Sequence, residues 1–426
     1  MLLLYNMIQL LGLVLLWPFL VLLTLCRTKY RARIPARLGF GLLALAEKIP
    51  AGRPRIWIHA LSVGEVASAV TLVRALRSHF PEAVLLFSAS TSSGERYARA
   101  VPSLPVDSFL PFPLDAYPVV RRFVKLLRPD LFILIETDFW PNFLHVLAAA
   151  NVPALLVNGR ISRKSYTRYT SLRPFFQPLF DSFTILAMQR QEDVHSMISL
   201  GLRPDKVAYL GNLKYDAMLP AACNRKIIDR AELGVPLGSI MLIAGSTHEG
   251  EEEIIGRVFG KLLEECPSLF LIIAPRNIER VPGVLQYIRR QGFAASNRST
   301  GLRSGDRVLV LDTMGELAGL YGLADLAFIG GSLVAAGGHN PLEPAVLGTP
   351  VFFGPHMEDF ADVVEDMLSA GCAVQARTED ELYRGIRLYL GNQELRKEKG
   401  KAAREFVESR QGVSMRHIEL IRQVLA

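Results

Sequence analysis

Residues 55–76 read RIWIHALSVGEVASAVTLVRAL, and this stretch decides the fold. The apolar run 55–60 is continuous rather than alternating, which is typical of a parallel strand covered on both faces. Gly64 supplies a turn, and a helical pattern begins near Glu65. A strand, a short glycine turn and a helix in this order predict one unit of a doubly wound α/β sheet.

The same alternation continues along the chain. Further strands are predicted at 84–88, 131–136, 154–158, 184–188 and 207–210, and then at 240–244, 269–274, 307–311, 326–329 and 350–353. Helical patterns include 65–76 and 119–127, and two more, 379–390 and 395–425, close the chain. The irregular stretch 212–238 marks a junction. We therefore expect an N-terminal Rossmann-like domain (55–220) and a C-terminal one (221–426) that face each other across a cleft.

The N-terminal residues 1–26 carry no charged side chain, and Ile8 to Cys26 is nearly all apolar. A run of this length predicts a membrane anchor helix. Basic residues follow the run instead of preceding it, which argues against a cleaved signal peptide and places the rest of the chain on the cytoplasmic side. A shallower interfacial anchor is the alternative, because Asn6 and Pro18 weaken a spanning helix.

The positive charge of the chain is confined to the segment after this anchor. The formal net charge is +7, and residues 27–55 alone hold eight Lys or Arg against Glu47. A basic juxtamembrane segment (27–54) therefore accounts for the excess, and a basic nucleic-acid groove is excluded. Its partner is predicted to be the anionic cytoplasmic leaflet of a membrane.

Glu65 is the first candidate for chemistry. It lies at the carboxyl end of a predicted strand and in the first turn of a helix. An acid there stabilises the helix dipole by about 0.3–1 kcal/mol. A carboxylate at a strand end can also act as a general base for an attacking hydroxyl. Position alone does not decide between the two roles.

A metal centre is not indicated. The motif at 244–253, AGSTHEGEEE, contains His248-Glu249, but an HExxH site would need His where Glu252 stands. The four cysteines form no CxxC pair. We expect instead that Ser246 or Thr247 caps a helix with an acidic first turn. No metal and no other cofactor is expected.

Three segments at predicted strand ends suit an anionic ligand. Arg276, after Pro275, could bind a phosphate or carboxylate with its planar fork, with a surface arginine as the alternative. The amides of Met314-Gly315-Glu316 could receive a base or phosphate. Residues 328–345, FIGGSLVAAGGHNPLEPA, predict a glycine loop and then a helix capped by Asn340, with Pro341 at its first position and Glu343 in its first turn. A dinucleotide or ATP enzyme is disfavoured, because neither GxGxxG nor GK[ST] occurs.

Taken in order, these motifs resemble those of the 3-deoxy-D-manno-octulosonic acid (Kdo) transferases, which glycosylate lipid A. The resemblance covers nearly the whole chain, from the N-terminal anchor onward. It is carried by SVGE (62–65), ETDFWPN (136–142), NGRIS (158–162), GNLKYD (211–216), GSTHE (245–249), PR (275–276), MGE (314–316) and NPLE (340–343). Asp138 departs from the family pattern, which more often has Glu.

The resemblance implies a GT-B fold and a metal-independent, inverting transfer of Kdo from CMP-Kdo to the lipid A precursor lipid IVA, in lipopolysaccharide core biosynthesis at the cell inner membrane. It implies that Glu65 is the catalytic base. It also implies that Pro275-Arg276, Met314-Gly315-Glu316 and Asn340-Pro341-Leu342-Glu343 contact CMP.

Alternatives remain for the lipid contacts and for the activity. The stretches 40–55 and Arg160–Arg173 are candidates for holding lipid phosphates, and a solvated basic loop is the alternative for the second. A GT-B-fold nucleotide-sugar epimerase would need no membrane anchor. A membrane-tethered nucleotide-binding module without catalysis would need no base at Glu65.

Overall fold

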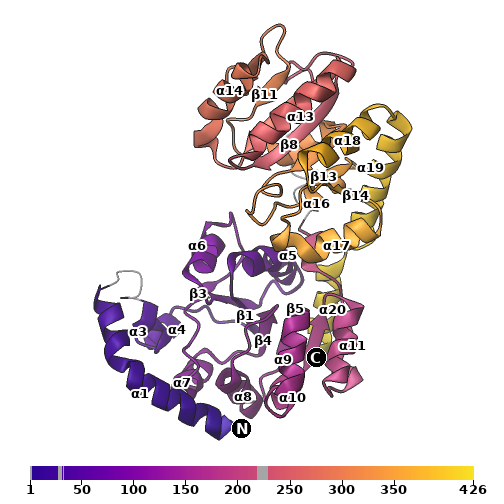
Figure 1. The fold of residues 1–426 in the computed structure, drawn as a ribbon. Helices are drawn as coiled ribbons and strands as arrows, with labels where there is room; N and C mark the ends of the chain where they lie inside the picture. Colours follow the sequence, from indigo (N-terminus) through magenta and orange to yellow (C-terminus); the bar gives the residue numbers. More distant parts are fainter. Residues whose placement is uncertain (1, 27–30, 32, 218–228) are drawn as a thin grey trace. The chain divides into compact units, whose positions relative to one another are not determined.

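The computed structural model describes residues 2–26, 31, 33–217 and 229–426. The chain divides into two compact units, Met1–Ala217 with Gly412–Ala426, and Met218–Gln411. Arg27 and Lys29 of the basic segment, and Cys223, lie outside the described residues. Each unit is built around its own parallel sheet, as expected for a doubly wound fold (Figure 1).

The first unit contains a sheet of seven strands within its described residues, in the order β3-β2-β1-β4-β5-β6-β7. All neighbours pair in parallel. The strands are β1 Arg55–Ala60, β2 Val84–Ala89, β3 Ser108–Leu110, β4 Leu131–Ile135, β5 Ala154–Gly159, β6 Ile185–Met188 and β7 Val207–Tyr209.

Helices cover both faces of this sheet. The helices described in this unit are α1 Leu2–Cys26, α3 Arg33–Arg37, α4 Leu42–Ala46, α5 Val63–His79, α6 Ser92–Ala100, α7 Tyr117–Leu127, α8 Pro141–Ala149, α9 Arg163–Ser171, α10 Arg173–Asp181, α11 Gln191–Ser199 and α20 Val413–Leu425. One face packs α4, α7, α8, α10 and α11 around Trp57, and the other packs α5, α6 and α20. Alternate residues of β1 therefore serve opposite cores, which explains its unbroken apolar run.

The second unit repeats the architecture. Its described strands form a seven-stranded parallel sheet in the order β10-β11-β9-β8-β12-β13-β14. The strands are β8 Ile240–Thr247, β9 Leu269–Pro275, β10 Ala295–Asn297, β11 Val308–Val310, β12 Leu326–Ile329, β13 Val351–Phe353 and β14 Ala373–Gln375. The helices are α13 Glu251–Glu265, α14 Val281–Arg290, α15 Leu317–Leu320, α16 Leu342–Ala345, α17 Ala361–Ser369, α18 Glu379–Leu390 and α19 Gln393–Glu408, with the short turn η5 Glu358–Phe360.

The eleven strands expected from the sequence are all present, and three others were missed. The missed strands are β3, β10 and β14, and each is three residues long and lies at the edge of a sheet. An edge strand is covered on fewer sides, so it needs no continuous apolar run. The periodic signal that revealed the central strands is therefore absent from these three.

The end of the chain differs from expectation. The single helical pattern expected at 395–425 is broken at Gly412, which has φ +81°, into α19 and α20. The helix α20 belongs to the first unit rather than the second. Asp216 fixes its start by accepting hydrogen bonds from Gly412 N at 2.8 Å and Ser414 N at 2.6 Å. Val413, Ile418 and Ile421 then complete the core over α5.

The helix α1 lies along the outside of the first unit, past the ends of α7 and α8 (Figure 1). Polar side chains near its start bind this surface. Tyr5 Oη donates to Asp115 Oδ2 at 2.9 Å, Gln9 Nε2 donates to the Asp115 carbonyl at 3.0 Å, and Asn6 Oδ1 accepts from Asn142 Nδ2 at 2.7 Å.

Within the part of the chain that the structure describes, no helix combines the length and apolar character that crossing a bilayer requires. The spanning form of the anchor expected at residues 8–26 is therefore not supported.

Candidate active site

Glu65 stands at the carboxyl edge of the first sheet, in the first turn of α5. Ser62 caps the helix and accepts a hydrogen bond from Glu65 N at 3.4 Å. Glu65 Oε2 reaches back to accept from Leu61 N at 2.5 Å. This reciprocal arrangement is a variant of the capping box. Oε1 accepts no hydrogen bond from the described residues. Oε2 therefore stabilises the start of α5, and Oε1 is available to accept a proton.

The surroundings of Glu65 favour its neutral form. The residue is only 6% exposed, and burial raises the pKa of its carboxyl to about 8. The hydrogen bond from Leu61 opposes this shift in pKa, while the negative charges of Glu136 and Asp138 add to it. A carboxylate whose pKa lies near physiological pH is suited to accept a proton during a reaction.

Two more carboxylates follow β4 at the same edge, and no role was predicted for either from the residues themselves. Glu136 is buried and has φ +62°, a conformation that a non-glycine residue holds only when its surroundings enforce it. It accepts from Asn158 Nδ2 at 3.2 Å and pairs with Arg160 Nε at 3.4 Å. In the sequence, these two carboxylates are marked only by their position, because Glu136-Thr137-Asp138 directly follows a predicted strand.

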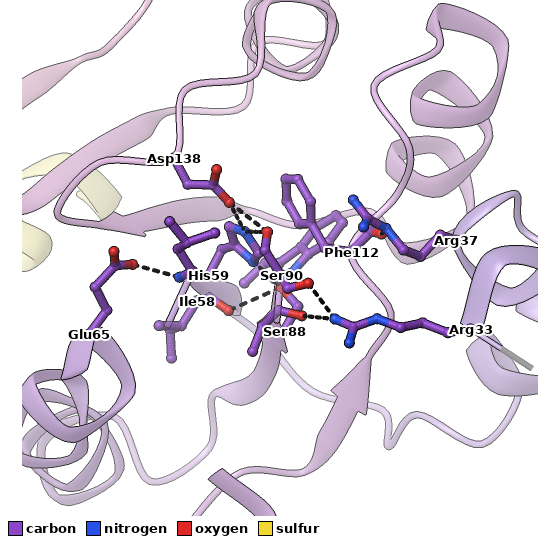
Figure 2. Close-up of polar contacts among 12 residues, drawn as sticks. Arg33, Arg37, Ile58, His59, Glu65, Ser88, Ser90, Phe112 and Asp138 are labelled. Carbon is purple, nitrogen blue, oxygen red and sulfur yellow. Dashed lines mark hydrogen bonds and ion pairs between the residues drawn. The ribbon is translucent and has the colours of Figure 1, made fainter. Parts of the chain in front are cut away.

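Asp138 is held by a buried chain of hydrogen bonds that begins at Trp57. Figure 2 labels the other members of this chain, Ser88, His59 and Asp138. Trp57 Nε1 donates to Ser88 Oγ at 2.8 Å, and Ser88 Oγ lies 2.8 Å from His59 Nδ1. His59 Nε2 lies 3.0 Å from Asp138 Oδ2, which also accepts from Ser90 Oγ at 2.5 Å.

Burial lowers the pKa of His59, so the ring is neutral. The chain then assigns its proton to Nε2, which donates to Asp138, while Nδ1 accepts from Ser88. Burial alone would raise the pKa of Asp138, but the hydrogen bonds from His59 and Ser90 hold it below its usual value. Asp138 is therefore a fixed negative charge beside Glu65.

Two arginines of the basic segment also reach this edge (Figure 2). Arg33 donates to the carbonyls of Ala89 and Ser90, and Arg37 Nε donates to the Phe112 carbonyl at 3.0 Å. The sequence assigned the whole segment to the membrane surface. These two cations instead bind backbone carbonyls at the ends of β2 and β3, and Arg37 lies close enough to Asp138 for their charges to interact.

The donor-binding residues expected from the sequence lie at strand ends of the second unit. Pro275 ends β9, and Arg276 follows it with its side chain exposed. In the next segment, Met314 is 77% exposed and Gly315 has φ +86°. Glu316 is engaged already, accepting from Arg298 Nε at 3.2 Å and Thr313 Oγ1 at 2.9 Å.

The helix expected after Asn340 differs in length and start. Asn340 Oδ1 accepts from Leu342 N at 3.1 Å, but Pro341 occupies the cap position and α16 spans only four residues. Such a turn has little macrodipole, so a phosphate site built on it loses the expected helix contribution. Burial raises the pKa of the Tyr321 phenol, and the negative charge of Glu343, half-buried in the first turn of α16, adds to this shift.

The expectation that Ser246 or Thr247 caps the next helix was wrong. The strand β8 continues through a bulge to Thr247, so α13 begins only after Gly250. The first turn of α13 is acidic, as expected, and one of its carboxylates, Glu251, binds backbone N–H groups. The buried Glu251 carboxylate accepts from the backbone N–H groups of His248, Gly331, Ser332 and Leu333 at 2.6–2.9 Å, and so fixes the turn that follows β12.

Comparison with solved structures identifies the class of fold. A UDP-GlcNAc 2-epimerase from Neisseria meningitidis bound to UDP-GlcNAc superposes with a TM-score of 0.61 over 87% of this chain and 100% of that one, at 12% identity. The glycotransferase of kitacinnamycin gives a TM-score of 0.55 over 88% of this chain and 100% of that one, at 14% identity. At these identities the likeness shows the fold alone, that of two-domain GT-B proteins.

Sequence relatives identify the family. Residues 32–217 match the family model described as 3-deoxy-D-manno-octulosonic-acid transferase (kdotransferase). A 3-deoxy-D-manno-octulosonic acid transferase from Haemophilus influenzae is 34% identical over 96% of this chain and 95% of its own length. One from Rickettsia felis is 30% identical over 88% of this chain and 80% of its own length. The chain belongs to the Kdo transferase family of glycosyltransferases.

Proposed function

We propose that this enzyme moves Kdo from CMP-Kdo to lipid IVA with inversion at the anomeric carbon, in lipopolysaccharide core biosynthesis. The observation that carries the proposal is Glu65, a buried carboxylate at the strand edge of a Kdo transferase chain, one oxygen of which accepts no hydrogen bond from the described residues. Its burial and the neighbouring negative charges give it the proton affinity of a general base.

In the proposed reaction, Glu65 Oε1 takes the proton from the acceptor's 6′-hydroxyl as that oxygen attacks the anomeric carbon. The bond from this carbon to the CMP phosphate breaks on the opposite side, which inverts the configuration. Asp138 and Glu136 keep the local field negative, so the carboxylate of Glu65 binds the proton strongly. His59 keeps Asp138 in place and charged.

The second unit would hold the donor. Arg276 at the end of β9 is the exposed cation suited to the phosphate, and the glycine turn after β12 lets a ligand approach the backbone. Pro275, Met314, Gly315, Glu316 and residues 340–343 would complete the CMP site.

We also propose that the first unit lies on the cytoplasmic face of the inner membrane through α1, in the shallow interfacial manner. Large apolar side chains of this helix are exposed: Leu4, Met7, Ile8, Leu10, Leu11, Val14, Leu15, Leu16 and Phe19. Phe175 of α10 contacts Tyr5 of α1 with ring centroids 6.2 Å apart, and the exposed Arg163, Lys164 and Arg168 lie on the adjoining α9. Each basic residue near an anionic leaflet contributes about 1 kcal/mol.

The decisive test incubates the full-length enzyme with CMP-Kdo and lipid IVA in detergent micelles and measures the lipid product by mass spectrometry. We expect lipid IVA to gain the mass of Kdo, in proportion to CMP released, and the spectrum also counts the sugars added. Release of free Kdo without a change in the lipid would contradict the acceptor assignment. Isomerisation of the nucleotide sugar would favour an epimerase instead.

The pH dependence of transfer provides a second test. Glu65 must be deprotonated to act as a base, and burial raises its pKa to about 8. The protonated, inactive form therefore predominates below this pH, and kcat/KM should rise with pH and level off above about 8. Initial rates at limiting lipid IVA and saturating CMP-Kdo across this range would show the acid limb. A value of kcat/KM that does not change between acidic and alkaline pH would show that Glu65 is not the titrating base.

A further inference from the structure

Two histidines meet at the carboxyl edge of the second sheet, where the strand order reverses. β9 pairs with one side of β8 and β12 with the other. His248 follows β8, and His339 lies in the loop between β12 and α16. Their Nε2 atoms are 2.9 Å apart, and the rings are nearly parallel. In doubly wound sheets, ligands bind in the crevice outside this reversal point.

The short distance between His248 Nε2 and His339 Nε2 requires a single proton between these two atoms. Two unprotonated Nε2 atoms would oppose their lone pairs at 2.9 Å, and two N–H groups would clash. One Nε2 therefore donates and the other accepts. Two neutral rings meet this condition when one carries its proton on Nε2 and the other on Nδ1. A further proton can be added at the remaining Nδ1 without breaking the contact.

The backbone around the pair is built to hold both rings. Gly331 has φ +69°, and a Cβ atom there would lie 3.3 Å from Cδ2 of each imidazole. Glu251 fixes the chain on both sides by accepting hydrogen bonds from His248 N and Gly331 N. Both rings are half-buried, so they border solvent rather than the core.

Charged groups from several elements surround the pair. Arg276 follows β9, Glu249 is adjacent to His248, and Glu251 lies at the start of α13. Asp359 of η5 has its Oδ2 2.8 Å from the position of a Cβ on Gly337. Burial, Arg276 and His248 together lower the pKa of His339 to about 4. His339 is therefore neutral near pH 7 when no ligand is bound.

We propose that His248 and His339 form a proton-coupled anion site, in which the phosphodiester of the sugar nucleotide binds as a proton from solvent adds to a ring Nδ1 atom. The two rings then share one positive charge through the Nε2 contact, and the new N–H donates to a phosphate oxygen. Beside Arg276, a second cation is stable only while an anion neutralises it. This inference rests on the proposed function, because that function places the nucleotide in the second unit.

Calorimetry measures such proton uptake directly. The probe is the methyl ester of CMP, whose phosphodiester carries one charge and does not titrate near neutrality. The full-length enzyme is titrated at about pH 6.5, near the ordinary pKa of histidine, in two buffers with different enthalpies of ionisation. We expect uptake of a substantial fraction of one proton per site, and tighter binding as the pH falls from about 8 to about 6.

Two variants identify the group that takes up the proton. His339→Asn and His248→Asn should each abolish the uptake and weaken binding about tenfold near pH 6, since a hydrogen bond to a charged group is lost. His195→Asn, on the exposed face of α11 in the first unit, is the matched control and should behave as wild type. Melting curves show that each variant is folded, and the two pair variants test the site independently.

The possible failures are distinct. Binding of the ester by the wild type without proton uptake, or with uptake that persists in both pair variants, would overturn the proton-coupled site and leave the proposed function standing. No binding of the ester by the wild type would contradict the proposed function itself, and the inference with it.

Discussion

Glu65→Gln is expected to lower the rate of Kdo transfer by about 10²–10⁴-fold, the usual contribution of a positioned general base. The amide oxygen can still accept the hydrogen bond from Leu61 N, so α5 keeps its start. Binding of CMP should be unchanged, because the proposed nucleotide contacts are all in the second unit. Single-turnover transfer and calorimetry with CMP measure the two effects separately.

A neighbouring residue offers a matched control. Glu95 lies in the first turn of α6 after β2, as Glu65 lies in the first turn of α5 after β1. It pairs with Arg99 at 3.1 Å on the surface. Glu95→Gln should change the rate less than about twofold, as is typical of exposed pairs. Equal rates for Glu65→Gln and wild type would mean that Glu65 acts only as a helix cap.

Glu251→Ala is expected to destabilise the second unit by about 3–5 kcal/mol. The carboxylate is fully buried and satisfies four backbone N–H groups, and its removal leaves buried donors at Gly331 and Ser332 without a partner. Calorimetry should show the transition of this unit shifted down by roughly 10 °C. Amide exchange should accelerate at Gly331–Leu333 in particular.

The control for this change is in the same helical turn. Glu253 is exposed, and it shares with Glu251 only its place near the positive end of the α13 dipole. Glu253→Ala should cost less than about 1 kcal/mol. Similar losses from both substitutions would show that the carboxylate stabilises the helix dipole and does not fix the turn after β12.

The sequence predicted the parts of the site that are local. The strand, turn and helix around Glu65 follow from a continuous apolar run, one glycine and an amphipathic pattern, and all three lie within about twenty residues. The central strands were predicted for the same reason. Three of the four edge strands, β3, β10 and β14, were missed because their three residues are too few to show a pattern, whereas the edge strand β7 was predicted.

The contacts that tune the site were not predictable in this way. His59 lies in an apolar run and suggests a core position. Its function depends on Ser88, which faces it in the parallel register of β1 and β2, and on Asp138, which follows β4. In the sequence, Glu251 is likewise indistinguishable from the other two acids in the first turn of α13. Its role is visible only in the fold, where the backbone of the turn after β12 donates to its carboxylate. Sheet register brings these partners together, and a single sequence does not contain it.

The return of α20 to the first unit has a consequence for any attempt to produce the units one at a time. A fragment that stops at Ala217 would lack Val413, Ile418 and Ile421, and α5 would expose the apolar strip that they cover. Such a fragment should aggregate unless the last fifteen residues are supplied, either as a separate peptide or grafted after Ala217 by a linker. Residues 218–411, by contrast, are continuous in the chain and could be expressed as one piece.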